Sequence, residues 1–183
     1  MRFTVKFFLP LLLIFINLSN SFAIEDMEIG INRMQNSIEV TTSIIPSKEF
    51  IDDFKEGLSK NLLILIEFYR KWSIIPDEFI SGVQIQRIFI SDPIKEEFIV
   101  KSIEGQILRE KKFKNWQDAL EWGLKINPVR VVDINNLEKG KYYVKVTVES
   151  NIRKLPLVLE HILFFIPRYE KRITKESETF RLP

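Results

Sequence analysis

The segment 141–150 constrains the fold most strongly, because apolar and polar side chains alternate along it. One side carries Tyr142, Val144, Val146 and Val148, and the other carries Tyr143, Lys145, Thr147 and Glu149. A period of two is that of a β-strand, whose successive side chains point to opposite faces. One buried face and one wet face are typical of antiparallel sheets. The segment therefore predicts a strand in an antiparallel sheet with one face on the core.

Similar but weaker patterns predict further strands. We expect them at 37–45, 62–72, 79–90, 97–103, 106–113 and 128–134, with a weak edge strand within 168–181. Glu104-Gly105 is a turn signal between two of these segments. The polar stretch from Glu25 to Asn36 predicts only a lead-in to the first strand.

Two segments carry helix signals. Ser47 is a suitable N-cap, and the apolar face that follows is Phe50, Ile51, Phe54 and Leu58, so we expect a helix that ends near 59–61. Asn115 can cap a second helix, with Asp118 reaching back to it, and its apolar face is Trp116, Ala119, Leu120 and Leu124. About eight strands, mostly adjacent in sequence, with two or three helices predict an α+β fold. We expect mainly antiparallel β-sheet or a sandwich, with the helices packed on it.

The first 23 residues have the layout of a secretory signal peptide. Arg2 and Lys6 precede the apolar run from Phe7 to Ile16, and Ser21-Phe22-Ala23 has small residues where a signal peptidase cleaves. The prediction is a signal peptide over 1–23 and a single exported α+β domain over 24–183, secreted across the inner membrane into the periplasm. The alternative is an uncleaved anchor, although a spanning helix needs roughly 20 apolar residues and this run is shorter.

Charge and cysteine content exclude several classes of protein. The chain has 27 basic and 25 acidic residues, and without Arg2 and Lys6 the balance is 25 to 25. A neutral chain gives no electrostatic basis for binding nucleic acid. The chain has no cysteine, which excludes disulfides, thiolate metal sites and a lipidated N-terminal cysteine. An exported domain of this kind must be held together by its core.

The residues that could perform chemistry are few. His161 is the only histidine, and it lies in an apolar segment, so the ordinary expectation is a structural residue and not a catalytic or zinc-binding one. The carboxylates that could act as acid or base are Glu25, Asp26, Glu28, Asp52, Asp53, Glu56, Glu96 and Glu97. They fall on expected surface faces, several of them beside lysines, where solvated charge is the commoner role. We therefore assign no catalytic, cofactor-binding or metal-binding residue and predict that the protein is not an enzyme.

Three other features could contact a partner. One basic cluster is Arg109, Lys111, Lys112 and Lys114, and a second is Arg168, Lys171, Arg172 and Lys175. Either could meet an acidic partner or acidic lipid headgroups, but interleaved acids favour an ordinary charged surface. The apolar segment from Leu155 to Ile166 is too short to span a membrane and fits either a buried helix or a buried strand. It could cover the sheet core or form an exposed contact patch.

Several strings, in this order, resemble a bacterial exported family known as domain of unknown function 4390. They are Leu65 to Trp72, Phe98-Ile99-Val100, Gly105, Phe113, Ala119-Leu120, Leu137, Gly140-Lys141-Tyr142-Tyr143 and Leu155-Pro156. The likeness covers most of Ile38 to Phe180 and is loose at Ser177 to Phe180. The resemblance implies a small exported or envelope protein and supplies no activity and no catalytic residues.

These observations favour a non-enzymatic periplasmic module that binds an envelope protein. The alternative is a carrier of an apolar ligand or lipid, in a sheet–helix cavity lined by residues such as Phe54, Phe68 and Trp116. A hydrolase that uses two carboxylates is a third hypothesis. Membrane contact is expected only through an uncleaved N-terminus or the segment Leu155 to Ile166.

Overall fold

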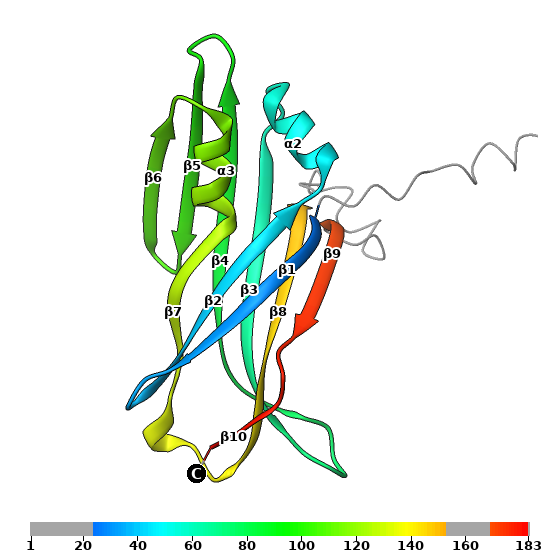
Figure 1. The fold of residues 1–183 in the computed structure, drawn as a ribbon, viewed down its shortest axis with the longest axis vertical. Helices are drawn as coiled ribbons and strands as arrows, with labels where there is room; N and C mark the ends of the chain where they lie inside the picture. Colours follow the sequence, from blue (N-terminus) through cyan, green and yellow to red (C-terminus); the bar gives the residue numbers. More distant parts are fainter. Residues whose placement is uncertain (1–23, 153–168, 183) are drawn as a thin grey trace, which may run out of the picture.

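A computed structural model describes residues 24–152 and 169–182, and these residues form two antiparallel sheets and two α-helices (Figure 1). The smaller sheet has the order β1 (Ile24–Arg33), β2 (Ser37–Pro46), β7 (Lys125–Asp133). The larger sheet has the order β10 (Phe180–Leu182), β8 (Gly140–Ile152), β3 (Lys60–Lys71), β4 (Glu78–Asp92), β5 (Glu97–Glu104), β6 (Ile107–Phe113), with β9 (Tyr169–Glu176) also paired to β8. The helices are α2 (Lys48–Lys55) and α3 (Trp116–Leu124), and a short 3-10 turn, η2 (Ile134–Asn136), follows β7. The predicted α+β class with mainly antiparallel sheet is confirmed.

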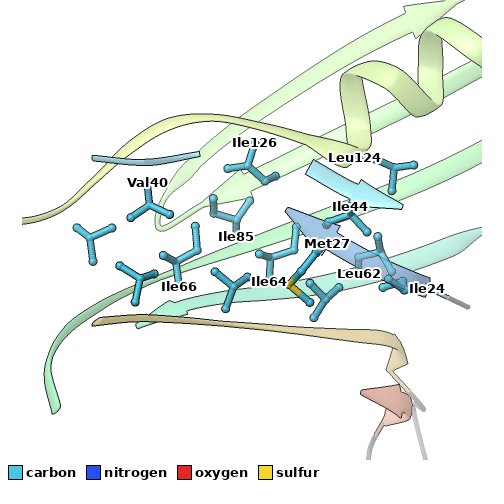
Figure 2. Packing of buried hydrophobic residues seen from close by; sticks show 14 of the residues in the cluster. Ile24, Met27, Val40, Ile44, Leu62, Ile64, Ile66, Ile85, Leu124 and Ile126 are labelled. Atoms are coloured by element: carbon cyan, nitrogen blue, oxygen red, sulfur yellow. The ribbon is translucent and has the colours of Figure 1, made fainter. Parts of the chain in front are cut away.

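The core lies between the two sheets, where their inward side chains meet (Figure 2). Every second residue of β3 from Leu62 to Phe68 is fully buried, and Figure 2 shows Leu62, Ile64 and Ile66 in this layer. The small sheet contributes Met27 and Val40, which are also fully buried. Burial of apolar surface at about 25 cal/mol per Å² makes this layer the main source of stability, because the chain has no disulfide.

Helix α2 lies against one end of the large sheet. The Ser47 hydroxyl accepts a hydrogen bond from the Phe50 backbone N–H at 3.1 Å, which confirms the predicted N-cap. Phe50 and Phe54 pack edge-on against Phe89 at ring distances of 5.5 and 5.9 Å. The helix ends at Lys55, earlier than predicted, and Leu58 lies outside it with 52% of its surface exposed.

Helix α3 connects the edge of the large sheet to the edge of the small one. The Asp118 backbone N–H donates to Asn115 Oδ1 at 2.7 Å, and the Asn115 amide donates to Asp118 Oδ2 at 2.8 Å, so the predicted cap is confirmed. Of the predicted apolar face, Ala119, Leu120 and Leu124 are buried and Trp116 is partly buried.

Three further predictions were wrong. The expected lead-in is the strand β1, which pairs with β2 along its length. Strand β7 begins at Lys125 and continues through Pro128, because the helix already ends at Leu124 and Pro128 falls where the register with β2 shifts. The expected single edge strand in 168–181 is two strands, β9 and β10, that pair with different parts of β8.

The predicted wet face of β8 is also largely covered. Tyr143 is 6% exposed and Thr147 is fully buried, although both point away from the core between the sheets. Neighbouring strands supply the cover: the Tyr69 ring stacks on Tyr143 at 5.5 Å, and the Thr174 hydroxyl lies 3.1 Å from that of Thr147. The alternation in sequence was therefore a correct signal for a strand but not for a solvated face.

The predicted signal peptide over 1–23 and the apolar segment Leu155 to Ile166 lie outside the described residues. Within the part that is described, no helix combines the length and the apolar character needed to cross a bilayer.

Candidate functional site

A groove runs along α3 and is lined by residues of β6 and β7, which are end strands of the two sheets. Among the described strands, β6 pairs only with β5 and β7 only with β2, so each leaves one strand edge unpaired. The groove has a volume of about 860 Å³, and residues of β4, β5, β6, α3 and β7 line it. We call it the α3 groove. Its size is within the range of ligand pockets, roughly 300–1,000 Å³.

Three strands of the large sheet place a polar row on the side of the groove. The pairing of β4 with β5 sets Arg87 opposite Ser102, and the pairing of β5 with β6 sets Ser102 opposite Arg109. Arg87 takes an inward position because it alternates with Ile85 and Phe89, which are fully buried. Arg87 is consequently only 5% exposed, whereas the Arg109 side chain is 59% exposed.

The Arg87 side chain is almost fully buried and has no hydrogen-bond partner among the described residues. Its Nε is shielded from solvent and unpaired, and its nearest carboxylate oxygen, Oε1 of Glu104, lies 4.0 Å from Nη2. The indole of Trp122 on α3 lies 5.0 Å from the guanidinium carbon. Burial lowers the pKa of Arg87 and the Glu104 charge raises it, but an arginine stays protonated at any physiological pH. The groove therefore contains a permanent and incompletely compensated positive charge.

Glu104 lies between the two arginines but is hydrogen-bonded to neither. Its Oε1 accepts a hydrogen bond from the Ser102 hydroxyl at 3.1 Å, and its Oε2 lies 3.9 Å from Nη1 of Arg109. Both arginine contacts are ion pairs at the limit of direct interaction and exceed hydrogen-bond length. Glu104 thus offsets one unit of charge in the groove and leaves the donors of Arg87 free.

The rim of the groove is basic. The predicted cluster Arg109, Lys111, Lys112 and Lys114 lines it in full. Sequence reasoning missed Lys125 and Arg130 of β7, which line the opposite side. With Arg87 the lining has seven basic residues against the three acids Glu104, Asp118 and Glu121, in a chain with an almost balanced charge.

Some of these rim charges are paired and some are not. Lys112 and Lys114 both interact with Glu97, at 3.8 and 3.2 Å. Lys111 lies 5.1 Å above the Phe113 ring, and neither Lys111 nor Lys125 has a carboxylate partner within the described residues. These two lysines are available to an acidic ligand.

The second basic cluster has a structural role where it is described. Three of its members pair with acids of other elements: Lys171 with Glu49 (3.5 Å), Arg172 with Glu149 (3.6 Å) and Lys175 with Asp26 (2.9 Å). The hydrogen bond from Lys175 lowers the pKa of Asp26. The fourth member, Arg168, lies outside the described residues. This cluster forms ion pairs across the surface and is not part of the groove.

The carboxylates considered for acid–base chemistry do not gather in the groove. Asp53 bonds the buried Lys60 ammonium, and Glu97 holds two lysines of the rim. Across residues 24–152 and 169–182, no three acidic or histidine side chains lie together in a way that could hold a metal ion. His161 lies outside these ranges.

The structure does not bring together the three residues proposed for an apolar cavity. Phe54 is fully buried against Phe98 at a ring distance of 5.3 Å, and Phe68 is fully buried and stacks on Tyr142, also at 5.3 Å. Trp116 lies beneath the ammonium of a lysine of α2. Phe54 and Phe68 are thus packed core residues, and none of the three lines the α3 groove.

One family model matches the chain, over residues 19–178, and it describes a domain of unknown function, DUF4390. No curated protein and no solved structure matches the chain.

Proposed function

The chain belongs to the DUF4390 family, whose function is unknown, and we propose that it is an exported, non-enzymatic module that binds an acidic, extended segment of an envelope protein. The α3 groove is the binding site in this proposal. The N-terminal signal layout supports export, and the protein partner follows from the chemistry of the groove.

The basic lining of the groove is the observation that carries the proposal. Seven basic residues against three acids form a local excess of positive charge, and a cleft lined by one sign of charge attracts a ligand of the opposite sign. Lys111 and Lys125, on opposite sides of the groove, have no acidic partner among the described residues, so an acidic ligand would not have to displace one.

The unpaired edges of β6 and β7 favour an extended polypeptide as the ligand. An extended segment can add to a free strand edge through backbone hydrogen bonds, while its side chains meet the groove. Charged side chains on an edge strand also discourage uncontrolled pairing. The lysines of β6 would therefore exclude neutral strands and admit acidic ones.

The test is binding of poly-L-glutamate to the purified full chain, measured by fluorescence anisotropy at several salt concentrations. We expect binding that weakens as salt is added, because exposed charges are screened over about 10 Å at 0.1 M ionic strength. The double variant Lys111→Glu/Lys125→Glu should weaken binding by about tenfold or more, since both contacts become repulsive.

The matched control makes the same charge change where β8 begins, outside the groove. Lys139→Glu/Lys141→Glu alters two exposed lysines outside the groove and should change the affinity by less than about twofold. Equal losses in the two double variants would show attraction to net charge alone and would contradict a site in the groove.

A further inference from the structure

We propose that Arg87 forms a binding site for a single carboxylate of the ligand, with Arg109 beside it as the second donor. We call this site the seat. This inference rests on the proposed function and names the chemical group that the centre of the α3 groove recognises. Arg87 is buried, lacks hydrogen bonds among the described residues and lies in one row with Ser102 and Arg109.

A buried guanidinium without a bonded acceptor is costly, because the lost hydration is not replaced. The Trp122 ring and the distant Glu104 carboxylate each compensate only part of that cost. A carboxylate can accept two parallel N–H hydrogen bonds from one arginine, and this bidentate pairing is a strong and specific way to satisfy the donors of the guanidinium. Neighbouring Arg109 is exposed and can reach the same ligand group from β6.

The charge of the seat favours a carboxylate over a phosphate dianion. Two guanidiniums and Glu104 leave one net positive charge at the centre. A group with one negative charge matches this balance, whereas a dianion loses more hydration free energy on burial and keeps one uncompensated charge beside Glu104, which accepts a hydrogen bond from the Ser102 hydroxyl. Glu104 thus competes with the ligand for the two arginines and favours oxyanions that carry a single negative charge.

The carboxylate can come from an acidic side chain of a protein or from a fatty acid, because Trp122 and Phe113 give the groove an apolar wall as well. The two sources share the same contact with Arg87. They differ in whether an acidic peptide or an aliphatic acid competes better for the seat.

The direct measurement is an NMR titration of the arginine Nε–H signals of the full chain with sodium acetate, and separately with inorganic phosphate. We expect the Arg87 signal to move downfield and saturate with acetate, and to respond less to phosphate, because the seat has one net positive charge. An Arg87 signal that does not saturate with acetate, or that responds more strongly to phosphate, would overturn the assignment.

Variants of the neighbours keep the test valid even if Arg87 itself cannot be replaced without unfolding. Arg109→Gln should weaken acetate binding by about tenfold, since a charged donor is lost. Glu104→Gln keeps an acceptor for Ser102 and should strengthen binding by about tenfold, because the competing charge is gone. Lys101→Gln, on the opposite face of β5 where Lys101 pairs with Glu110, should have no effect. A Glu104→Gln variant that binds acetate more weakly than the native protein would contradict the role given to Glu104.

Two competitors identify the source of the carboxylate and separate this inference from the proposed function. Displacement of acetate by poly-L-glutamate, and not by octanoate, supports a protein ligand. Displacement by octanoate, and not by poly-L-glutamate, supports a fatty acid; it overturns the proposed protein partner but leaves the assignment of the seat intact. If poly-L-glutamate binds through Lys111 and Lys125 while Arg87 ignores acetate, the groove function stands and the seat is wrong.

Discussion

Among the described residues, two buried cations lie on the inward face of the large sheet, and their surroundings differ. The Lys60 side chain is 7% exposed and its ammonium is bonded to Asp53, with the Phe50 ring 5.9 Å away. The Arg87 side chain is 6% exposed and has no such bonded acid. A buried charge is ordinarily retained with a bonded partner, because the penalty of desolvation is several kcal/mol. Lys60 follows that rule, and Arg87 departs from it at the point where the groove meets the sheet.

The buried hydroxyl of Tyr143 predicts that the protein loses stability at alkaline pH. Its hydroxyl donates to Asp77 Oδ2 at 3.1 Å, and burial together with that carboxylate raises the pKa of Tyr143 well above its ordinary value. Above about pH 10 the unfolded chain loses this proton while the folded protein keeps it, so the free energy of unfolding falls as pH rises. Below that pH both states hold the proton and this contribution to stability is constant.

The measurement compares urea unfolding of the native protein and Tyr143→Phe between pH 8 and pH 11. The variant should lose about 0.5–1.5 kcal/mol at pH 8, where it lacks the hydrogen bond. Between pH 8 and pH 11 the free energy of unfolding of Tyr143→Phe should fall less steeply than that of the native protein. Part of the decrease that remains in the variant comes from Tyr142, because burial also raises the pKa of Tyr142. Parallel curves for the two proteins would mean that Tyr143 does not carry the alkaline sensitivity.

Part of the groove could be predicted from sequence, and part could not. The rim cluster Arg109, Lys111, Lys112 and Lys114 was visible as a run of basic residues, although its function was not. Arg87 was missed because a single arginine in an apolar segment does not form a cluster. A signal was nevertheless present: Ile85 and Phe89 mark the inward positions of that strand, and Arg87 lies between them where an apolar residue is expected.

Helix α3 depends on a close approach to the large sheet. A Cβ atom added to Gly123 would lie 2.3 Å from the Phe89 ring and 3.1 Å from Val100, both of which are fully buried. Only a residue without a side chain lets the helix lie this near β4 and β5. The same approach brings Trp122, at the preceding position of the helix, over Arg87.

Gly123→Ala should therefore destabilise the protein although alanine favours helix formation. Overpacking a close contact costs about 1–3 kcal/mol, against a gain of about 1 kcal/mol in helix propensity, so we expect a net loss of up to about 2 kcal/mol in urea unfolding. Gln117→Ala, at an exposed position of the same helix, is the control and should change stability by less than about 0.5 kcal/mol. A stabilised Gly123→Ala variant would show that the helix can move away from Phe89 without cost.

Strand β1 shows why one element escaped prediction while β8 did not. Along β8 the apolar side chains Tyr142, Val144, Val146 and Val148 recur at every second residue, which is the signal that sequence reasoning uses. In β1 the register with β2 shifts between Ile24 and Asp26, so the buried residues Ile24 and Met27 are three positions apart. An irregularity of this kind removes the period of two, and the segment was consequently interpreted as a polar lead-in.

The two sheets share one core, and β1 supplies part of it. Met27 is fully buried between the sheets (Figure 2), and its carbonyl accepts a hydrogen bond from Lys175 of β9 at 2.6 Å. Lys175 also bonds Asp26 at 2.9 Å, so one side chain of the large sheet holds two residues of the small sheet. The edge strand is thus fixed by packing on one side and by an ion pair at the rim.

Met27→Ala should cost about 2–5 kcal/mol in urea unfolding, because it opens a cavity in the shared core. Met34→Ala provides a matched control at the turn between β1 and β2, where Met34 is 51% exposed, and should cost less than about 0.5 kcal/mol. Similar losses for the two variants would indicate that β1 is not part of the cooperative core.

The position of β3 has a consequence for how the protein reaches its native state. It lies between β4, which follows directly in the chain, and β8, which is synthesised only after four further strands and a helix. The hairpins from β3 to β6 can form locally, but one edge of β3 must stay open until β8 arrives to close it. Pairings of such long separation fold slowly, and an open, apolar strand edge is prone to aggregate in the meantime. Molecular chaperones that cover this edge until β8 pairs with it would therefore raise the yield of folded protein.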